Sequence, residues 1–100
     1  SGTHASPLDQ HNKSNSTGGP GTLTPSQDGE LFIFMAACGN SGQTPGTPTS
    51  PFTTLDTVTG GSVSSNFGLG AAYEIQTTAT TRTPVFSTAT GGVGATFKKA

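Results

Sequence analysis

The eight residues from Leu31 to Cys38 form the only unbroken apolar run in the 100-residue chain, and they constrain its fold more than any other feature. A run of this length is typical of a β-strand and is too short to span a membrane. Because apolar and polar side chains do not alternate in it, we expect both of its faces to be covered. The run therefore predicts a central strand. Its large side chains, the candidate core and assembly residues, are Leu31, Phe32, Ile33, Phe34 and Met35.

A second stretch shows the alternation of a strand with one buried face. Its larger side chains take every second position: Phe67, Leu69, Ala71, Tyr73 and Ile75. This pattern predicts that they form the core face and that the residues between them form a small or polar face. On that second face, Gly68 and Gly70 leave room for another backbone or an aromatic ring to approach closely.

Shorter signals complete an all-β interpretation. Further strands are predicted at residues 6–9, 52–58, 84–87 and 93–97, with a hairpin turn at 59–62. No stretch of the sequence shows apolar residues at helical spacing without Gly or Thr among them. We therefore predict an antiparallel β-sandwich of six to seven short strands, Ig-like or jelly-roll-like. Residues 1–29 are expected to form an extended polar N-terminal arm that can contribute edge strands, and residues 30–100 the sandwich core.

The composition limits both the core and the partners. Hydrophobic residues are 29% of the chain, charged residues are 9% and the formal net charge is −1. Such a small apolar content favours a neighbouring molecule that covers apolar surface or pairs with a free edge of the sheet. The low charge argues against binding to nucleic acid, because no basic patch is present to neutralise phosphates. No segment has the length of a membrane span.

Several short motifs together resemble β-sandwich modules of bacterial extracellular and phage structural proteins. The motifs are Ser1-Gly2, Ser6-Pro7-Leu8-Asp9, the stretch from Thr24 to Leu31, the stretch from Tyr73 to Ala79, and the C-terminal stretch from Ala95 to Ala100. The resemblance implies a location outside the cell or on a cell or virion surface. It also implies a strand before the Ser-Gly turn, at which this sequence begins, so we expect that strand either to be missing or to be supplied from elsewhere. Donation by a neighbouring copy would build a filament by strand addition.

Candidate chemistry is sparse. His4, Asp9 and His11 resemble metal ligands only loosely, and their spacing fits no strong template, so no metal is predicted. Asp56 and Glu74 could form a carboxylate pair of the kind that glycosidases use, but solvent-face carboxylates are the more common case. No nucleophile motif or cofactor motif is present. We expect no enzymatic activity and no cofactor, and we expect the single Cys38 to be a small buried hydrophobe.

Sugars enter the interpretation in two ways. Asn12 and Asn15 each begin a glycosylation sequon and are candidate modification sites. Binding of sugar by the chain itself needs an exposed aromatic platform, whereas Tyr73 lies on the predicted core face.

The first functional hypothesis is therefore a structural subunit of an extracellular filament, pilus-like fibre or virion appendage, assembled by β-strand complementation between copies. The alternative is a carbohydrate- or cell-surface-binding β-sandwich module of a larger secreted protein. Self-association is the main expected interaction, with glycans as the second. Whether Phe32, Phe34 and Met35 face a self-partner or a second sheet of the same chain stays open at this stage.

Overall fold

A computed structural model describes residues 5–39, 44–58 and 68–100 of the chain. These residues contain no helix, and thus no helix long and apolar enough to cross a membrane. The strands are β1 (Leu8–Ser14), β2 (Leu31–Cys38), β3 (Thr53–Val58), β4 (Gly68–Ile75) and β5 (Gly91–Phe97). The all-β prediction is confirmed, but the described strands number five rather than six to seven, and they form a single sheet.

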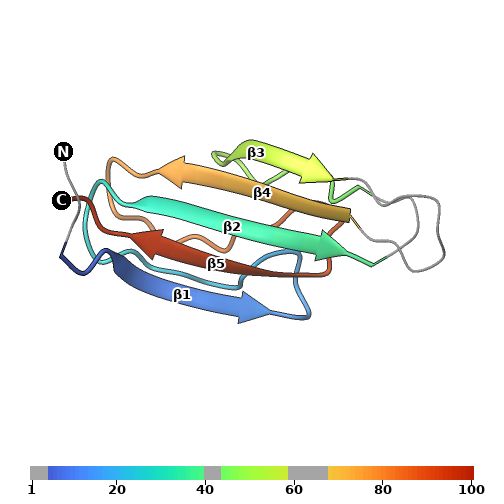
Figure 1. The fold of residues 1–100 in the computed structure, drawn as a ribbon, viewed down its shortest axis with the longest axis horizontal. Coiled ribbons are helices and arrows are strands. Elements are labelled where there is room, and N and C mark those ends of the chain that lie inside the picture. Colours follow the sequence, from blue (N-terminus) through green and yellow to red (C-terminus); the bar gives the residue numbers. More distant parts are fainter. Residues whose placement is uncertain (1–4, 40–43, 59–67) are drawn as a thin grey trace.

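The sheet is antiparallel throughout and has the order β1-β5-β2-β4-β3, which puts β2 at its centre (Figure 1). The apolar run is therefore the central strand, as predicted. It pairs with β4 from Leu31 opposite Ile75 to Cys38 opposite Gly68, and with β5 from Leu31 opposite Phe97 to Ala37 opposite Gly91. This continuous register fixes which side chains share each face of the sheet.

The two edge strands are less regular than the centre. In β1 the register shifts between Leu8 and Gln10, and in β3 it shifts between Thr54 and Asp56. Every residue of β3 is exposed. The N-terminal arm predicted over residues 1–29 thus supplies a full edge strand, β1, which pairs with β5 along its length.

Extended segments of the same chain, at residues 18–25, 44–50 and 80–88, cover one face of the sheet (Figure 1). We call this face the inner face and these three segments the cover. Backbone hydrogen bonds join Leu23 to Arg82 in both directions at 3.0 Å, and the Ser87 amide to the Thr47 carbonyl at 2.9 Å. Longer ladders do not form. Buried prolines explain this, because they lack the N–H that a ladder needs. They are Pro20, Pro25, Pro45 and Pro84.

For the same reason the strand predicted at residues 84–87 is absent. Phe86 forms an isolated bridge with Pro48, and its amide donates to the Gly18 carbonyl at 2.9 Å. Its ring nevertheless belongs to the core, with 1% of its surface exposed.

The core between the inner face and its cover is aromatic. Phe32 and Phe34 are 0% and 1% exposed, and each ring meets Phe52 edge-on with centroids 5.1 Å apart. Phe34 also packs against Phe86, with centroids 5.3 Å apart. The edge-to-face geometry of the two pairs with Phe52 adds to the free energy gained by burying the rings.

The buried face of β4 is the opposite of the predicted one. Gly68, Gly70 and Ala72 face the core and are buried, whereas Ile75 is 66% exposed. Gly70 shows the reason: a Cβ added there would lie 2.9 Å from Cζ of Phe86 and 3.0 Å from Cγ of Pro45. The close approach of an aromatic ring, expected at Gly68 and Gly70, is therefore observed at Gly70. The predicted hairpin at 59–62 and Phe67 lie outside the described residues.

Candidate functional site

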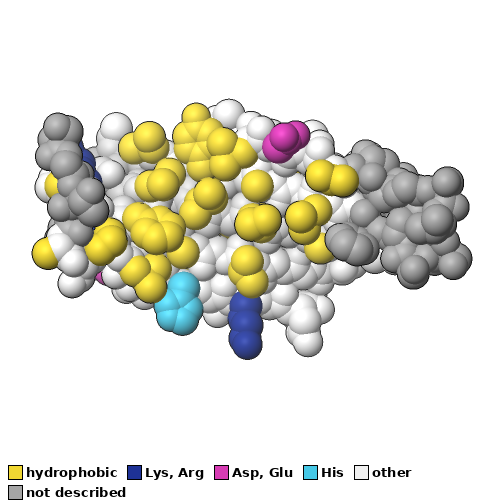
Figure 2. Space-filling model, in the orientation of Figure 1, with side chains coloured by type: hydrophobic (Ala, Val, Ile, Leu, Met, Phe, Trp, Pro, Cys, Tyr) yellow, Lys and Arg dark blue, Asp and Glu magenta, His cyan; other side chains and the backbone are white. Residues whose placement is uncertain are grey.

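The other face of the sheet, the outer face, is the strongest candidate for a functional site. It carries the side chains of alternate positions on all five strands. Its apolar members are Leu8, Leu31, Ile33, Met35, Ala37, Val58, Leu69, Ala71, Tyr73, Ile75, Val93, Ala95 and Phe97. Figure 2 shows hydrophobic side chains gathered across the middle of this face, over β2, β4 and β5.

Much of this apolar surface is open. Met35 at the centre of the sheet is 42% exposed, and Val93 beside it is 53% exposed. Leu8 and Ile75, near one end of the face, are 50% and 66% exposed. No described segment crosses the outer face, so the central strand is covered on one side only. The expectation that both of its faces are covered is not met by the described residues.

Charged groups stand at the two margins of the outer face. The register aligns Lys13, Val93, Met35, Ala71 and Asp56 in one row across the five strands. A lysine therefore lies at the β1 margin and an aspartate at the β3 margin, with apolar side chains between them (Figure 2). The Asp56 carboxylate accepts a local hydrogen bond from the Thr57 amide at 2.8 Å. Neither residue takes part in an ion pair within the described residues.

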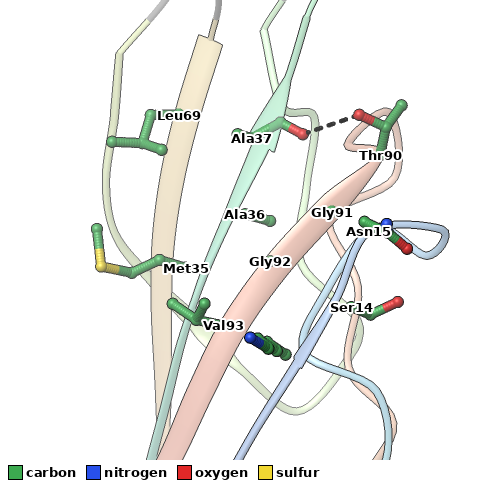
Figure 3. Close-up of a pocket in the computed structure, with 11 residues that line it drawn as sticks. Ser14, Asn15, Met35, Ala36, Ala37, Leu69, Thr90, Gly91, Gly92 and Val93 are labelled. Carbon is green, nitrogen blue, oxygen red and sulfur yellow. Dashed lines mark hydrogen bonds between the residues drawn. The ribbon is translucent and has the colours of Figure 1, made fainter.

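A shallow hollow of about 780 Å³ lies at one end of the outer face (Figure 3). Met35, Leu69 and Val93 project beside it from three neighbouring strands, and Gly91 leaves its floor open. A side chain at Gly91 could not fill it easily, because an added Cβ would lie 2.9 Å from the Ser14 carbonyl oxygen. The hollow is lined mainly by apolar groups, so it suits an apolar side chain better than a polar ligand.

The carboxylates weighed as a catalytic pair do not meet. Asp56 is on the outer face, opposite Ala71, whereas Glu74 is aligned with the buried Phe32 on the inner face. Glu74 has a structural partner instead: the Arg82 guanidinium donates to both of its oxygens, at 2.7 and 3.1 Å. Burial alone would raise the pKa of Glu74, but the hydrogen bonds from Arg82 and Gln76 and the charge of Arg82 hold it below its ordinary value.

The residues weighed as metal ligands are similarly dispersed. Asp9 accepts hydrogen bonds from the Ser26 amide at 2.7 Å and the Ser26 hydroxyl at 2.8 Å, and Lys98 Nζ lies 3.9 Å away. Burial would raise the pKa of Asp9, but the hydrogen bonds from Ser26, the hydrogen bond with the Glu30 side chain and the charge of Lys98 lower it. His11 is exposed at the β1 margin of the outer face, and His4 lies outside the described residues. Among the described residues, no group of three potential ligands converges.

Three other residues of interest occupy distinct environments. The Asn12 amide donates to the Thr22 carbonyl at 3.2 Å, so sugar attachment there competes with a hydrogen bond between β1 and the cover. Asn15 is exposed beyond the end of β1. Cys38 is a free cysteine and is 1% exposed, which confirms its prediction as a buried hydrophobe.

The candidate assembly residues divide between the two faces. Phe32 and Phe34 belong to the core, and the others that the structure describes lie on the outer face: Leu31, Ile33, Met35, Leu69, Tyr73 and Ile75. Sequence reasoning missed Val93, Lys13 and Asp56 as members of this surface. The alternation of Val93, Ala95 and Phe97 was a usable signal, but their alignment with β2 depends on the sheet order.

No known protein family, curated protein or solved structure matches the chain.

Proposed function

We propose that this chain is a structural subunit that assembles with copies of itself through its sheet, in an extracellular filament, pilus-like fibre or virion appendage. The observation that carries the proposal is the apolar outer face, which none of the described residues covers. Isolated exposed hydrophobic side chains are ordinary on a protein surface, but a contiguous apolar patch across a whole sheet marks an interaction site. A sandwich, in this proposal, forms when a second β-layer packs on the outer face.

Strand complementation is the contact we propose for growth beyond a pair. The exposed edge β3 offers main-chain donors and acceptors to an added strand, and β1 offers the opposite edge. The register shifts at Leu8 to Gln10 and at Thr54 to Asp56 interrupt these edges and shorten the stretch that can pair. Edge pairing is therefore expected to be the weaker contact and to require a higher protein concentration.

A mechanical role without catalysis fits the described charged groups. Glu74 is neutralised by Arg82 and Asp9 is held by Ser26 and Lys98, so both carboxylates act as structural ties. Asp56 lies on the other face of the sheet from Glu74, so these two carboxylates do not flank a common substrate as an acid and a base would.

Electron microscopy and sedimentation of the purified chain test the proposal. We expect association that increases with concentration, with regular polymers at the highest concentrations. Met35→Lys should abolish association, because it places a charge at the centre of the apolar face. Gln27→Lys adds the same charge at a partly buried position outside that face, on the loop before β2, and is the control that should leave association intact. A chain that stays monomeric at every concentration would contradict the proposal.

The second candidate, a carbohydrate-binding module, gains support from the position of Tyr73. This side chain lies on the outer face and is partly exposed, so it can contact a sugar ring. A binding module should remain monomeric and be retained on a glycan column, and Tyr73→Ala should abolish that retention. Retention that survives Tyr73→Ala would rule out this residue as the platform.

A further inference from the structure

We infer that the first contact in this assembly is a face-to-face pair, in which a second copy of the chain covers the outer face about a two-fold axis parallel to β2. The inference rests on the proposed function and specifies its geometry. The order β1-β5-β2-β4-β3 makes β2 the middle strand, so an axis along β2 divides the outer face into two halves. The rotation stacks β2 on its copy, β5 on β4 of the second copy, and β1 on β3 of the second copy.

The charges favour this orientation. The axis preserves position along the strands and exchanges the two ends of each row. In the row through Met35, it therefore brings Lys13 opposite Asp56 of the second copy, and the same contact forms twice. Both residues are exposed and neither has an ion-pair partner among the described residues of its own chain. Opposite charges at the rim of an apolar interface set its orientation.

An axis perpendicular to the strands gives the opposite result. It stacks β1 on β1 and β3 on β3, so the Lys13 margins of the two copies approach each other, and so do the Asp56 margins. Juxtaposed like charges oppose association. Of these two in-plane axes, the charges therefore favour the one parallel to β2.

The sizes of three pairs of facing side chains also favour the axis along β2. With the axis along β2, Ala95 lies opposite Tyr73 of the second copy, Ala71 opposite Val93, and Gly91 opposite Leu69. Each of these three pairs combines a large side chain with a smaller one, the arrangement that lets two layers interdigitate, whereas the row through Leu31 places Phe97 opposite Ile75 of the second copy. The third pair assigns an occupant to the hollow shown in Figure 3, namely Leu69 of the second copy.

The face is large enough for a specific contact. Five strands of up to eight residues cover about 24 by 27 Å, or roughly 650 Å² per copy. Two such faces bury about 1,300 Å², above the size of most crystal contacts and at the small end of specific interfaces. We therefore expect a pair that dissociates on dilution.

A charge-reversal cycle on the intact chain tests the orientation. Lys13→Glu and Asp56→Lys are made singly and together, and dissociation constants are measured by sedimentation equilibrium at low ionic strength. Each single reversal should weaken association by roughly tenfold, since the contact occurs twice, and the double reversal should restore it to within about threefold of the original. Lys99→Glu, an exposed reversal outside the outer face, is the control and should have no effect. Circular dichroism verifies that each variant is folded.

The outcomes separate the two proposals. Restoration in the double variant supports the axis along β2. Association that Met35→Lys abolishes, but in which the two reversals are merely additive, overturns this axis and leaves self-assembly in place. A chain that is monomeric throughout overturns both proposals, and retention on a glycan column by that monomer would assign the outer face to sugar instead.

Discussion

The side chains on the two faces of the sheet are packed in different ways. On the inner face β4 supplies small residues, such as Gly70 and Ala72, and the large side chains come from β2 and the cover, including Phe34 and Phe86. On the outer face the large side chains also come from the strands, and no described segment packs against them. Phe34 and Met35 are neighbours on β2, yet their exposed fractions are 1% and 42%.

The contrast shows how one strand can serve both stability and assembly. The inner face is completed within the chain, so its side chains determine whether the monomer folds. The outer face contributes little to the isolated monomer, because burial contributes free energy only when something covers the surface. Substitutions on the two faces should therefore separate folding from association.

The largest expected effect is on the inner face. Phe34→Ala should lower the free energy of unfolding by about 3–5 kcal/mol, because it removes a buried ring that contacts Phe52 and Phe86. Met35→Ala, one residue further along the same strand, should cost less than about 1 kcal/mol in dilute solution. Urea unfolding of both variants at low protein concentration makes the comparison. Equal losses would contradict the assignment of the two faces.

A smaller loss is expected where the strand must stay small. Gly70→Ala should cost about 1–3 kcal/mol, because the new methyl group meets the Phe86 ring and Pro45. Gly39→Ala is the matched control, since among the described residues no atom beyond its chain neighbours lies within 4 Å of a Cβ added there, and it should change stability by less than about 0.5 kcal/mol. Thermal unfolding reports both values. A Gly70→Ala variant with unchanged stability would contradict the close contact between the cover and β4.

The ion pair on the inner face should make stability depend on pH. Because the folded pKa of Glu74 lies below its ordinary value of 4.5, the contribution of this carboxylate is complete above that pH and declines as the pH falls through the folded pKa. Arg82→Met should cost about 1–3 kcal/mol at neutral pH, since it leaves a half-buried carboxylate without its strongest donor. Urea unfolding across the acid range should show this cost shrinking as the pH falls. A cost that is independent of pH would contradict the role of the pair.

The smallest effect on the monomer is expected on the outer face. Val93→Thr should change the unfolding free energy by less than about 0.5 kcal/mol in dilute solution, because Val93 is already 53% exposed. Association adds to apparent stability by mass action. The difference in unfolding temperature between the original chain and this variant should therefore increase as the protein concentration rises. Thermal unfolding over a dilution series measures this divergence. Parallel curves at all concentrations would show that Val93 is not covered by a second copy.

Much of the sheet could be predicted from local patterns. The run from Leu31 to Cys38 identified the central strand, and alternation located β4 and β5. The Thr-rich stretch from Phe52 to Val58 identified β3 to within one residue. These features are local: they depend on the period of a strand and on the length of an apolar run.

The burial of β4 could not be predicted in the same way. Alternation shows that two faces differ, and the larger side chains are normally the buried ones. Here the glycine face is buried because Phe86, far along the chain, packs against Gly70. The margins of the outer face were equally inaccessible, since the row that joins Lys13 to Asp56 exists only once the order of five strands is known.

The most direct test of the account uses Met35, the only methionine in the chain. Labelling its methyl group with carbon-13 gives one NMR signal from the centre of the outer face, and a soluble paramagnetic agent reports whether that methyl group is in contact with solvent. If a second copy covers the face, the signal should broaden strongly in dilute solution and be protected at high concentration. Equal broadening at every concentration would contradict the central claim that copies of this chain cover the outer face of each other.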